Sequence, residues 1–182
     1  MERDDGLARL RGLGFGEDDA LALWAHFDDA ETRGKPSHGH ARVDWLAGQS
    51  FDAAAEPRRI DESRWDGNGA VGYLVLARAC DDLLQAPPEQ ARLVVCERTF
   101  PTGMLGHHVR RLAAGGLVAV LAATSPARLG PPGGPKVAGT NPLAIGIPSS
   151  DGEPVVVDVS MGAVTWGDVV AGRASEIGRA HV

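Results

Sequence analysis

Residues 93–122, LVVCERTFPTGMLGHHVRRLAAGGLVAVLA, decide the fold class because they predict a strand, a helix and a second strand in succession. The two strands are the short apolar runs at 93–95 and 117–122, and, like the later apolar run at 155–159, they are predicted to be buried. Between them one helix face recurs at helical spacing until Gly115-Gly116 ends the helix. This face comprises Met104, Leu105, His108, Val109 and Leu112. Strands that alternate with helices predict an α/β sheet domain.

On the C-terminal side, the strand-like runs Leu143–Ile147 and Val155–Val159 extend the predicted sheet. A Gly- and Pro-rich loop at 126–139 precedes them. This loop lacks the Gly-Lys-Ser/Thr ending of a phosphate-binding P-loop, and no G-x-G-x-x-G motif follows a strand. The domain is therefore predicted to be neither a P-loop nor a Rossmann domain.

On the N-terminal side, we expect residues 1–50 to form a helical segment in front of a partial α/β domain at 51–176. A short helix is predicted at 37–46, where Ser37 is a favourable N-cap, and a longer one at 72–85. Polar residues between them, at 48–68, predict a connection with one or two short edge strands. An earlier helix face comprises Ala20, Leu23, Trp24 and Phe27.

Charge and cysteine content narrow the function classes. With 18 basic and 24 acidic residues the net charge is −6, which argues against a nucleic-acid-binding protein, because such proteins gather cations against phosphates. Cys80 and Cys96 have no C-x-x-C spacing, so we expect two free thiols in a reducing compartment. No signal region follows the acidic N-terminus and no apolar run reaches about 20 residues, which predicts a cytoplasmic protein without a membrane span.

The sequence Ser37-His38-Gly39-His40-Ala41-Arg42 predicts a candidate site near the start of a helix. If Ser37 caps the helix, His38 lies in its first turn and Arg42 follows one turn later on the same face. A guanidinium can hold a carboxylate with two hydrogen bonds, and an imidazole can transfer a proton near neutral pH. The pair suits a small 2-oxo or 2-imino acid; the alternative is a surface helix with solvated His and Arg.

Later segments supply further polar candidates. Asp158 and Ser160 stand at the end of a predicted strand, where α/β proteins bind ligands. Asp168, which follows Gly167, is either a site residue or an ordinary turn residue. The glycine-rich loop that leads to Thr140 is either a rigid connector or part of the same site.

Taken in order, these segments resemble the malate/L-lactate dehydrogenase-type oxidoreductases, which have a non-Rossmann nicotinamide-binding fold. The resemblance extends from about Leu13 to Arg173 and rests on an ordered set of motifs. They are Ser37-His38-Gly39 with Arg42, Asp66-Gly67-Asn68-Gly69, Gly116-Leu117, Pro132-Gly133-Gly134, Gly139-Thr140-Asn141-Pro142, Val157-Asp158-Val159-Ser160 and Gly167-Asp168. The resemblance implies a helical N-terminal segment and a mixed-sheet domain that is incomplete at the C-terminus.

Within this family, Gly167-Asp168 is similar to the branch that reduces Δ1-piperideine-2-carboxylate and Δ1-pyrroline-2-carboxylate. The resemblance implies that Ser37 and Asp168 form a charge relay around the proton donor His38, and that Arg42 and Thr140 contact the substrate. It implies NADP(H) as cofactor, with NAD(H) as the alternative, and a homodimer without a metal site. The implied cofactor contacts are Pro101, Thr102, Gly103, Met104, Leu105, Asp158, Val159 and Ser160.

The chain also departs from the family. Pro101-Thr102-Gly103 stands where many relatives have His-Phe-Gly, and we expect His107 and His108 to lie on the helix surface. Ala123-Thr124-Ser125 stands where an Asn-Ser pair is common. Relatives continue well beyond Arg173, and residues 177–182 back-translate to a common sequencing-adapter sequence, so we expect those residues to be a non-native tail.

Three other functions are alternatives to imino acid reduction. One is a 2-hydroxy acid dehydrogenase of the malate/lactate type, and another is an inactive fragment that only binds small carboxylates. The third is a hydrolase built on Ser37, His38 and Asp168. The sequence disfavours the hydrolase, because it has no G-x-S-x-G nucleophile elbow and because adjacent Ser and His at a helix start point apart.

Overall fold

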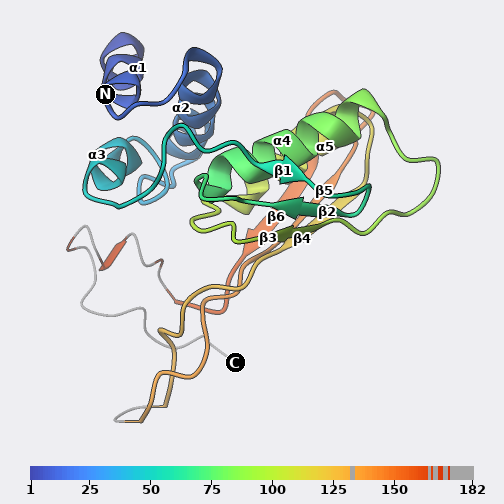
Figure 1. Ribbon diagram of the computed structural model, residues 1–182. Helices are drawn as coiled ribbons and strands as arrows, with labels where there is room; N and C mark the ends of the chain where they lie inside the picture. The colour runs from blue at the N-terminus through green and yellow to red at the C-terminus, as the bar shows by residue number, and fades with distance from the viewer. Residues whose placement is uncertain (132–133, 164, 166–167, 170–171, 173–182) are drawn as a thin grey trace.

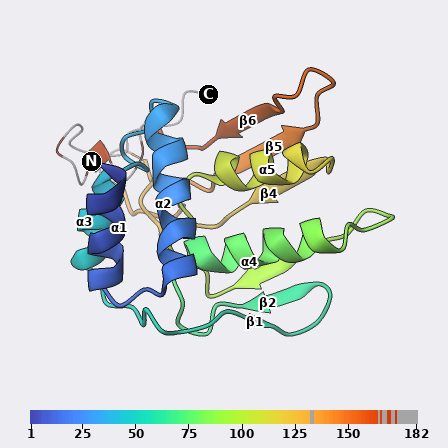
Figure 2. The same cartoon turned by 90° about the horizontal axis from the view of Figure 1, so that it is seen from above.

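The structure is a computed structural model that describes residues 1–131, 134–163, 165, 168–169 and 172 (Figure 1). The motif residues Pro132, Gly133 and Gly167 and the tail at 177–182 lie outside the described residues. In the described part, three helices lie together at one end, and two further helices each accompany a sheet at the other end (Figure 2). The predicted combination of a helical N-terminal segment with later helices and strands is confirmed.

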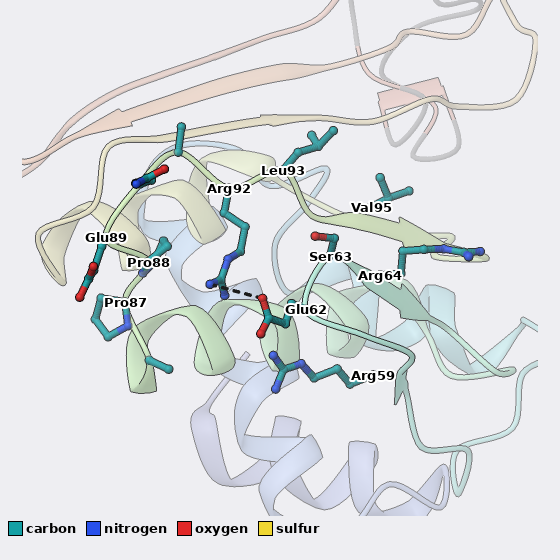
Figure 3. Close-up of a pocket in the computed structure, with 13 residues that line it drawn as sticks. Arg59, Glu62, Ser63, Arg64, Pro87, Pro88, Glu89, Arg92, Leu93 and Val95 are labelled. Atoms are coloured by element: carbon teal, nitrogen blue, oxygen red, sulfur yellow. Dashed lines mark ion pairs between the residues drawn. The ribbon is translucent and has the colours of Figure 1, made fainter.

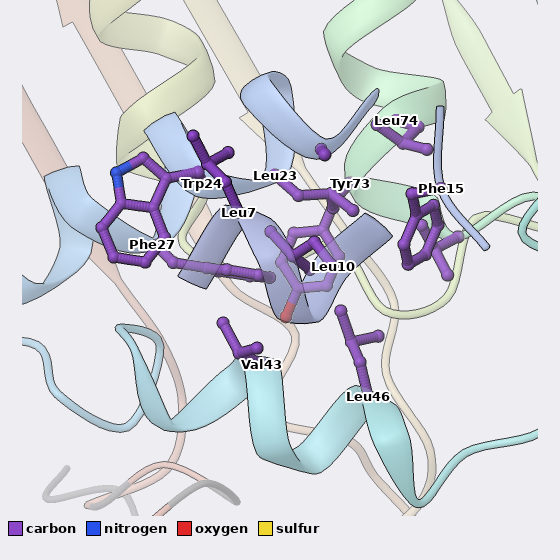
Figure 4. Packing of buried hydrophobic residues seen from close by; sticks show 12 residues of the cluster. Leu7, Leu10, Phe15, Leu23, Trp24, Phe27, Val43, Leu46, Tyr73 and Leu74 are labelled. Carbon is purple, nitrogen blue, oxygen red and sulfur yellow. The ribbon is translucent and has the colours of Figure 1, made fainter. Parts of the chain in front are cut away.

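The N-terminal helices are α1 (Arg3–Gly12), α2 (Glu17–Thr32) and α3 (Ala41–Ala47). The apolar face predicted for the second helix is buried, as expected from its spacing. Side chains of α4 (Gly72–Gln85) complete this core (Figure 4). The core comprises Leu7, Leu10, Phe15, Ala20, Leu23, Trp24, Phe27, Val43, Leu46, Val71, Tyr73 and Leu74.

The start of α3 corrects one prediction. Residues 36–40 form turns, and the helix begins at Ala41 with His40, rather than Ser37, at the N-cap. The turn hydrogen bonds run from His38 N–H to the Lys35 carbonyl and from Gly39 N–H to the Pro36 carbonyl. Ser37 therefore precedes the helix, and its partner Arg42 reaches back to it from the first turn of α3.

The first sheet consists of β1 (Arg58–Arg59), β2 (Arg64–Asp66) and β3 (Val95–Glu97). β1 is antiparallel to β2, whereas β2 is parallel to β3, so the sheet is mixed. The strand predicted at 93–95 is displaced toward the C-terminus, because its pairing with β2 places Cys96 opposite Trp65. Leu93, predicted to be buried, is 79% exposed.

The second sheet is an antiparallel one of β4 (Ala119–Ala122), β5 (Leu143–Ile147) and β6 (Val155–Val159). Helix α5 (Leu105–Ala114) covers one face of it. At Gly146 a Cβ would lie 2.4 Å from the Val109 carbonyl oxygen, so glycine permits the close approach of α5 to β5.

The apolar strands were predicted to be buried, but in the described part of the chain this sheet is covered on one face only. Outward side chains alternate with inward ones along each strand, as the pleat requires. The outward row is aliphatic and exposed, and its most exposed members are Val120, Leu143, Ile147, Val155, Val157 and Val159. Within the described residues, no helix is long and apolar enough to cross a membrane. Cys80 and Cys96 are both free thiols, as predicted.

Candidate active site

The turn at 36–40 and the first turn of α3 form the centre of the candidate site. Ser37 and Arg42 are buried, at 5% and 7% exposure. The Nε–H of Arg42 donates to the Ser37 carbonyl oxygen at 2.7 Å, and the guanidinium lies 5.0 Å from the ring centroid of Trp45. These contacts orient a buried cation beside His38. His38 and Arg42, which were predicted to act together, are therefore neighbours. Only Arg42 lies in the helix, because α3 begins at Ala41.

His38 is held as a neutral imidazole in this surrounding. Its Nδ1 is buried and has no hydrogen-bond partner in the described part of the chain. Burial lowers the pKa of His38 to about 4, and the positive charges of Arg42 and Lys35 act in the same direction, while Asp168 opposes them. With a pKa of about 4 the imidazole is neutral at pH 7.

Ser37 and Asp168 are joined by a residue that the sequence analysis did not select. The hydroxyl of Thr165 lies 2.9 Å from the Ser37 hydroxyl and 2.7 Å from Asp168 Oδ2. Thr165 has one hydroxyl proton, and a carboxylate only accepts, so this proton serves Asp168. The Ser37 hydroxyl then donates to Thr165. The described hydrogen bonds thus connect the two predicted ends of the relay through Thr165, and the predicted role of His38 between them stays a prediction.

The two segments predicted to contact the cofactor meet at the start of α5. Asp158, in β6, accepts a hydrogen bond from Gly106 N–H through Oδ2 at 2.7 Å. The carboxylate therefore lies against the positive end of the helix dipole. Burial nevertheless raises the pKa of Asp158, against the lowering effect of the Gly106 amide and of Lys35. The loop at 101–105 lies immediately before this helix turn.

Thr140 belongs to a neighbouring cluster of hydroxyl groups. Its hydroxyl lies 3.1 Å from that of Ser125, which also accepts a hydrogen bond from Asn141 N–H. The Thr140 carbonyl accepts from Met161 N–H at 2.8 Å, one residue beyond Ser160. Thr140 is thus adjacent to the end of β6. Its predicted contact with the substrate stays a prediction.

The prediction that His107 and His108 lie on the helix surface is wrong. His108 is 1% exposed, so its ring is buried in the packing of the helix. The His107 side chain is 12% exposed and its Nδ1 lies 3.0 Å from Asp29 Oδ2. Both rings turn toward His26, with centroids at 4.7 and 5.1 Å, because this face of α5 packs against α2. Among the described residues, no group of His, Cys, Asp and Glu is arranged to hold a metal ion.

Sequence reasoning also missed His26 and Lys35. His26 lies three residues after Leu23 on the apolar face of α2, and that spacing could have marked it as buried. Lys35 is exposed and forms no ion pair with any described residue, yet its charge lowers the pKa of both His38 and Asp158. Its position just before Ser37 is the only signal in the sequence.

A pocket of about 820 Å³ lies away from these residues, between the end of α4 and the β1–β2 connection (Figure 3). None of the predicted site residues lines it. Its arginines are already paired, Arg92 with Glu62 at 3.9 Å, Arg59 with Asp82 and Arg64 with Glu97. We therefore place the candidate site at the 36–42 turn rather than in this pocket.

Comparison with known proteins identifies one family. A family model described as malate/L-lactate dehydrogenase matches residues 7–176. A (2R)-3-sulfolactate dehydrogenase (NADP(+)) of Chromohalobacter salexigens is 27% identical over 92% of the chain and 53% of its own length. A Δ1-pyrroline-2-carboxylate/Δ1-piperideine-2-carboxylate reductase of Pseudomonas aeruginosa is 32% identical over 73% of the chain and 43% of its own length.

Comparison with solved structures also finds a reductase of this kind. The crystal structure of Δ1-piperideine-2-carboxylate reductase from Pseudomonas syringae pvar. tomato is similar with a TM-score of 0.79 and 27% identity. The similarity covers 96% of the chain and 56% of that structure. The chain spans about half the length of the relatives that it matches.

Proposed function

The chain belongs to the malate/L-lactate dehydrogenase family, and from this premise we propose that it serves the NAD(P)H-dependent reduction of a small cyclic imino acid. The substrate class is that of Δ1-pyrroline-2-carboxylate and Δ1-piperideine-2-carboxylate. The observation that carries the proposal is the buried guanidinium of Arg42 beside the neutral imidazole of His38. A homodimeric assembly and a cytoplasmic location belong to the same proposal.

The electrostatics of the site suggest how substrate binding prepares the proton donor. The substrate carboxylate would pair with Arg42, whose charge lowers the pKa of His38 in the free protein. Pairing cancels part of this effect, so the pKa of His38 rises when a carboxylate binds. A higher pKa would let His38 carry the proton that it transfers to the nitrogen of the C=N bond. Asp168 favours the same charged form of His38.

The residues present fit a nicotinamide cofactor at the start of α5. Gly106 engages Oδ2 of Asp158, which leaves Oδ1 of the carboxylate for a ligand group. The unpaired ammonium of Lys35 supplies a positive charge near Asp158 for an anionic cofactor. The loop at 101–105 and residues 158–160 would hold the cofactor, which supplies hydride to C2 of the substrate.

Lys35 also favours a second candidate, the reduction of a 2-oxo acid that has another acidic group. A second cation whose charge acts on His38 would hold the additional anion of a substrate such as 3-sulfopyruvate, the ketone that corresponds to sulfolactate. A cyclic imino acid has one carboxylate only and makes no use of this charge. In the first candidate Lys35 would serve only the anionic cofactor, whereas in the second it would hold the additional anion of the substrate; Arg42 would serve both.

One experiment tests both candidates. The 182-residue chain is mixed with NADPH or NADH and either Δ1-pyrroline-2-carboxylate or 3-sulfopyruvate, and loss of cofactor absorbance is followed. We expect turnover of the cyclic imine that His38→Ala removes, whereas faster turnover of sulfopyruvate would favour the second candidate. If neither substrate is reduced but both bind, as measured by calorimetry, the chain is a carboxylate-binding fragment without activity.

A further inference from the structure

His26 lies against the loop that carries five of the proposed cofactor contacts. Its side chain, on α2, is 2% exposed, and its Nε2 accepts a hydrogen bond from Met104 N–H at 3.0 Å. Accepting this bond requires an unprotonated Nε2, so the ring proton lies on Nδ1. Nδ1 is buried and has no hydrogen-bond partner in the described chain. The only hydrogen bond found for this imidazole is thus the one to the loop.

The loop backbone rests directly on His26 and Tyr73. At Gly103 the backbone has a φ of +71°, and a Cβ there would lie 2.4 Å from His26 Nε2 and 2.2 Å from Tyr73 Cε1. Any side chain at this position would push the loop off the two rings. The close approach therefore fixes the loop on this surface, and Met104 follows it in the sequence.

The amide of Met104 lies outside the hydrogen-bond ladder of α5, because Met104 is the N-cap residue with extended backbone angles. Two residues later, the Gly106 N–H donates to Asp158. Two backbone amides at the start of α5 thus donate to side chains of two other elements. The Met104 amide donates to His26 of α2, and the Gly106 amide donates to Asp158 of β6. Together they fix the direction in which the loop enters α5.

We propose that His26 is a positioning residue that holds the loop at 101–105 in the conformation that binds the nicotinamide cofactor. The identity of this ligand rests on the proposed function, whereas the hold on the loop rests on the contacts of His26. The ring acts through the loop backbone, which it contacts at the Met104 amide. It is kept in place by Tyr73, His107 and His108, whose ring centroids lie 4.7–5.1 Å from its own.

The acceptor nitrogen is the property that an apolar side chain cannot supply. Met104 is 6% exposed, so without His26 its N–H group would be buried and unpaired. An unpaired buried donor is costly, and the loop would move to reach water. His26→Phe removes the acceptor but fills the space, whereas His26→Gln places an amide oxygen near the position of Nε2. The two variants form a matched pair.

The test compares both variants with the unsubstituted chain in two measurements. Amide hydrogen exchange at Met104 reports the hold on the loop, and the Kd for NADPH reports its consequence. We expect His26→Phe to raise the exchange rate at Met104 and the Kd for NADPH by about tenfold each. His26→Gln should leave both quantities within about threefold of the unsubstituted chain. Exchange at Leu10 and Val75, in the helical cores, should stay unchanged in both variants.

The outcomes separate this inference from the proposed function. Equal exchange and equal Kd in the folded Phe variant would overturn the role of His26. If the unsubstituted chain binds neither NADPH nor NADH, the proposed function fails, and exchange alone decides whether His26 holds the loop. If the Phe variant does not fold, NMR of the unsubstituted chain decides. A scalar coupling across the hydrogen bond between His26 Nε2 and the Met104 amide nitrogen supports the role of His26, and its absence overturns it.

Discussion

The hydroxyl oxygens of Ser37 and Thr165 lie 2.9 Å apart, although 128 residues separate them in the sequence. Thr165 also holds Asp168 Oδ2 twice, through its hydroxyl at 2.7 Å and its backbone N–H at 3.0 Å. This arrangement connects the turn before α3 to the segment after β6. It gives Asp168 a fixed carboxylate oxygen near His38, whose charged form that carboxylate favours.

Thr165→Val should therefore loosen Asp168 and weaken the proton donor. Valine has the shape of threonine but leaves the Ser37 hydroxyl without this acceptor and removes the hydroxyl that donates to Asp168. We expect the kcat for the cyclic imine to fall about tenfold, whereas Thr165→Ser should retain most of it. Turnover with saturating NADPH measures this effect, and equal kcat values for Val and Ser would contradict it.

Regular elements were predictable from the sequence because their periodicity is local. The helix face of α5 was predicted, and the strands β5 and β6 were predicted with the bounds that the structure shows. The start of α3 was not, because the turn before it depends on tertiary contacts. At Gly39, for instance, a Cβ would lie 2.0 Å from Glu31 Oε2 of the preceding helix. Local capping preference for Ser37 could not reveal that contact.

The candidate site shows the same limit. Ser37, His38 and Arg42 are close in sequence, so their proximity could be predicted from one motif. Thr165 could not, since its partner Ser37 lies 128 residues away and a single threonine carries no pattern. His108 was misplaced because histidine occurs both on surfaces and in cores, and only the packing of α5 on α2 decides between them.

Arg42→Lys should weaken both substrate binding and the local structure. Lysine keeps the charge but loses the planar fork that holds a carboxylate, the donor to the Ser37 carbonyl and the flat contact with Trp45. We expect kcat/KM for a carboxylate substrate to fall by the factor that corresponds to losing about 1.5–3 kcal/mol of transition-state stabilisation. We also expect a lower Tm. Arg9→Lys, on an exposed face, is the control. Unchanged kinetics would remove Arg42 from the site.

His38→Ala and Asp168→Asn separate the proton donor from the group that supports it. Loss of a positioned general acid typically costs about 10²–10⁴ in kcat, which we expect for His38→Ala. Asp168→Asn should lower kcat in the same direction while the Kd for NADPH is retained, because an amide no longer favours the imidazolium. Full turnover in Asp168→Asn together with loss in His38→Ala would make Asp168 an ordinary turn residue.

Acid should destabilise the protein within a defined pH range. Burial lowers the pKa of His26 and His108 well below 6.5 and that of His38 to about 4. The unfolded chain therefore binds more protons than the folded one once the pH falls below about 6.5, and stability is lost down to the folded pKa values. Each unit of lowered pKa corresponds to about 1.4 kcal/mol.

Urea unfolding at pH 7.5 and pH 5 measures this loss. His108→Phe should reduce the difference between the two pH values, because it removes one of the buried bases. Burial alone would raise the pKa of Asp29, but hydrogen bonds from His107 and Arg33 lower it to about 2. The folding stability that Asp29 contributes is therefore lost only as the pH falls below 3.8. A free energy of unfolding that stays constant from pH 7.5 to pH 5 would contradict the assignment of neutral buried histidines.

The uncovered face of the second sheet predicts self-association of the 182-residue chain. Its outward row includes Val120, Val155 and Val157, which are 49–67% exposed and form one continuous apolar surface with β5. Such a surface on an open sheet promotes association.

Val157→Lys places a charge at the centre of this surface and costs little folding stability, since the side chain is already half exposed. We expect it to shift the chain toward monomer in sedimentation velocity, whereas Gln90→Lys, the same added charge on an exposed loop, should not. A monodisperse monomer before any substitution would show that this face does not drive association.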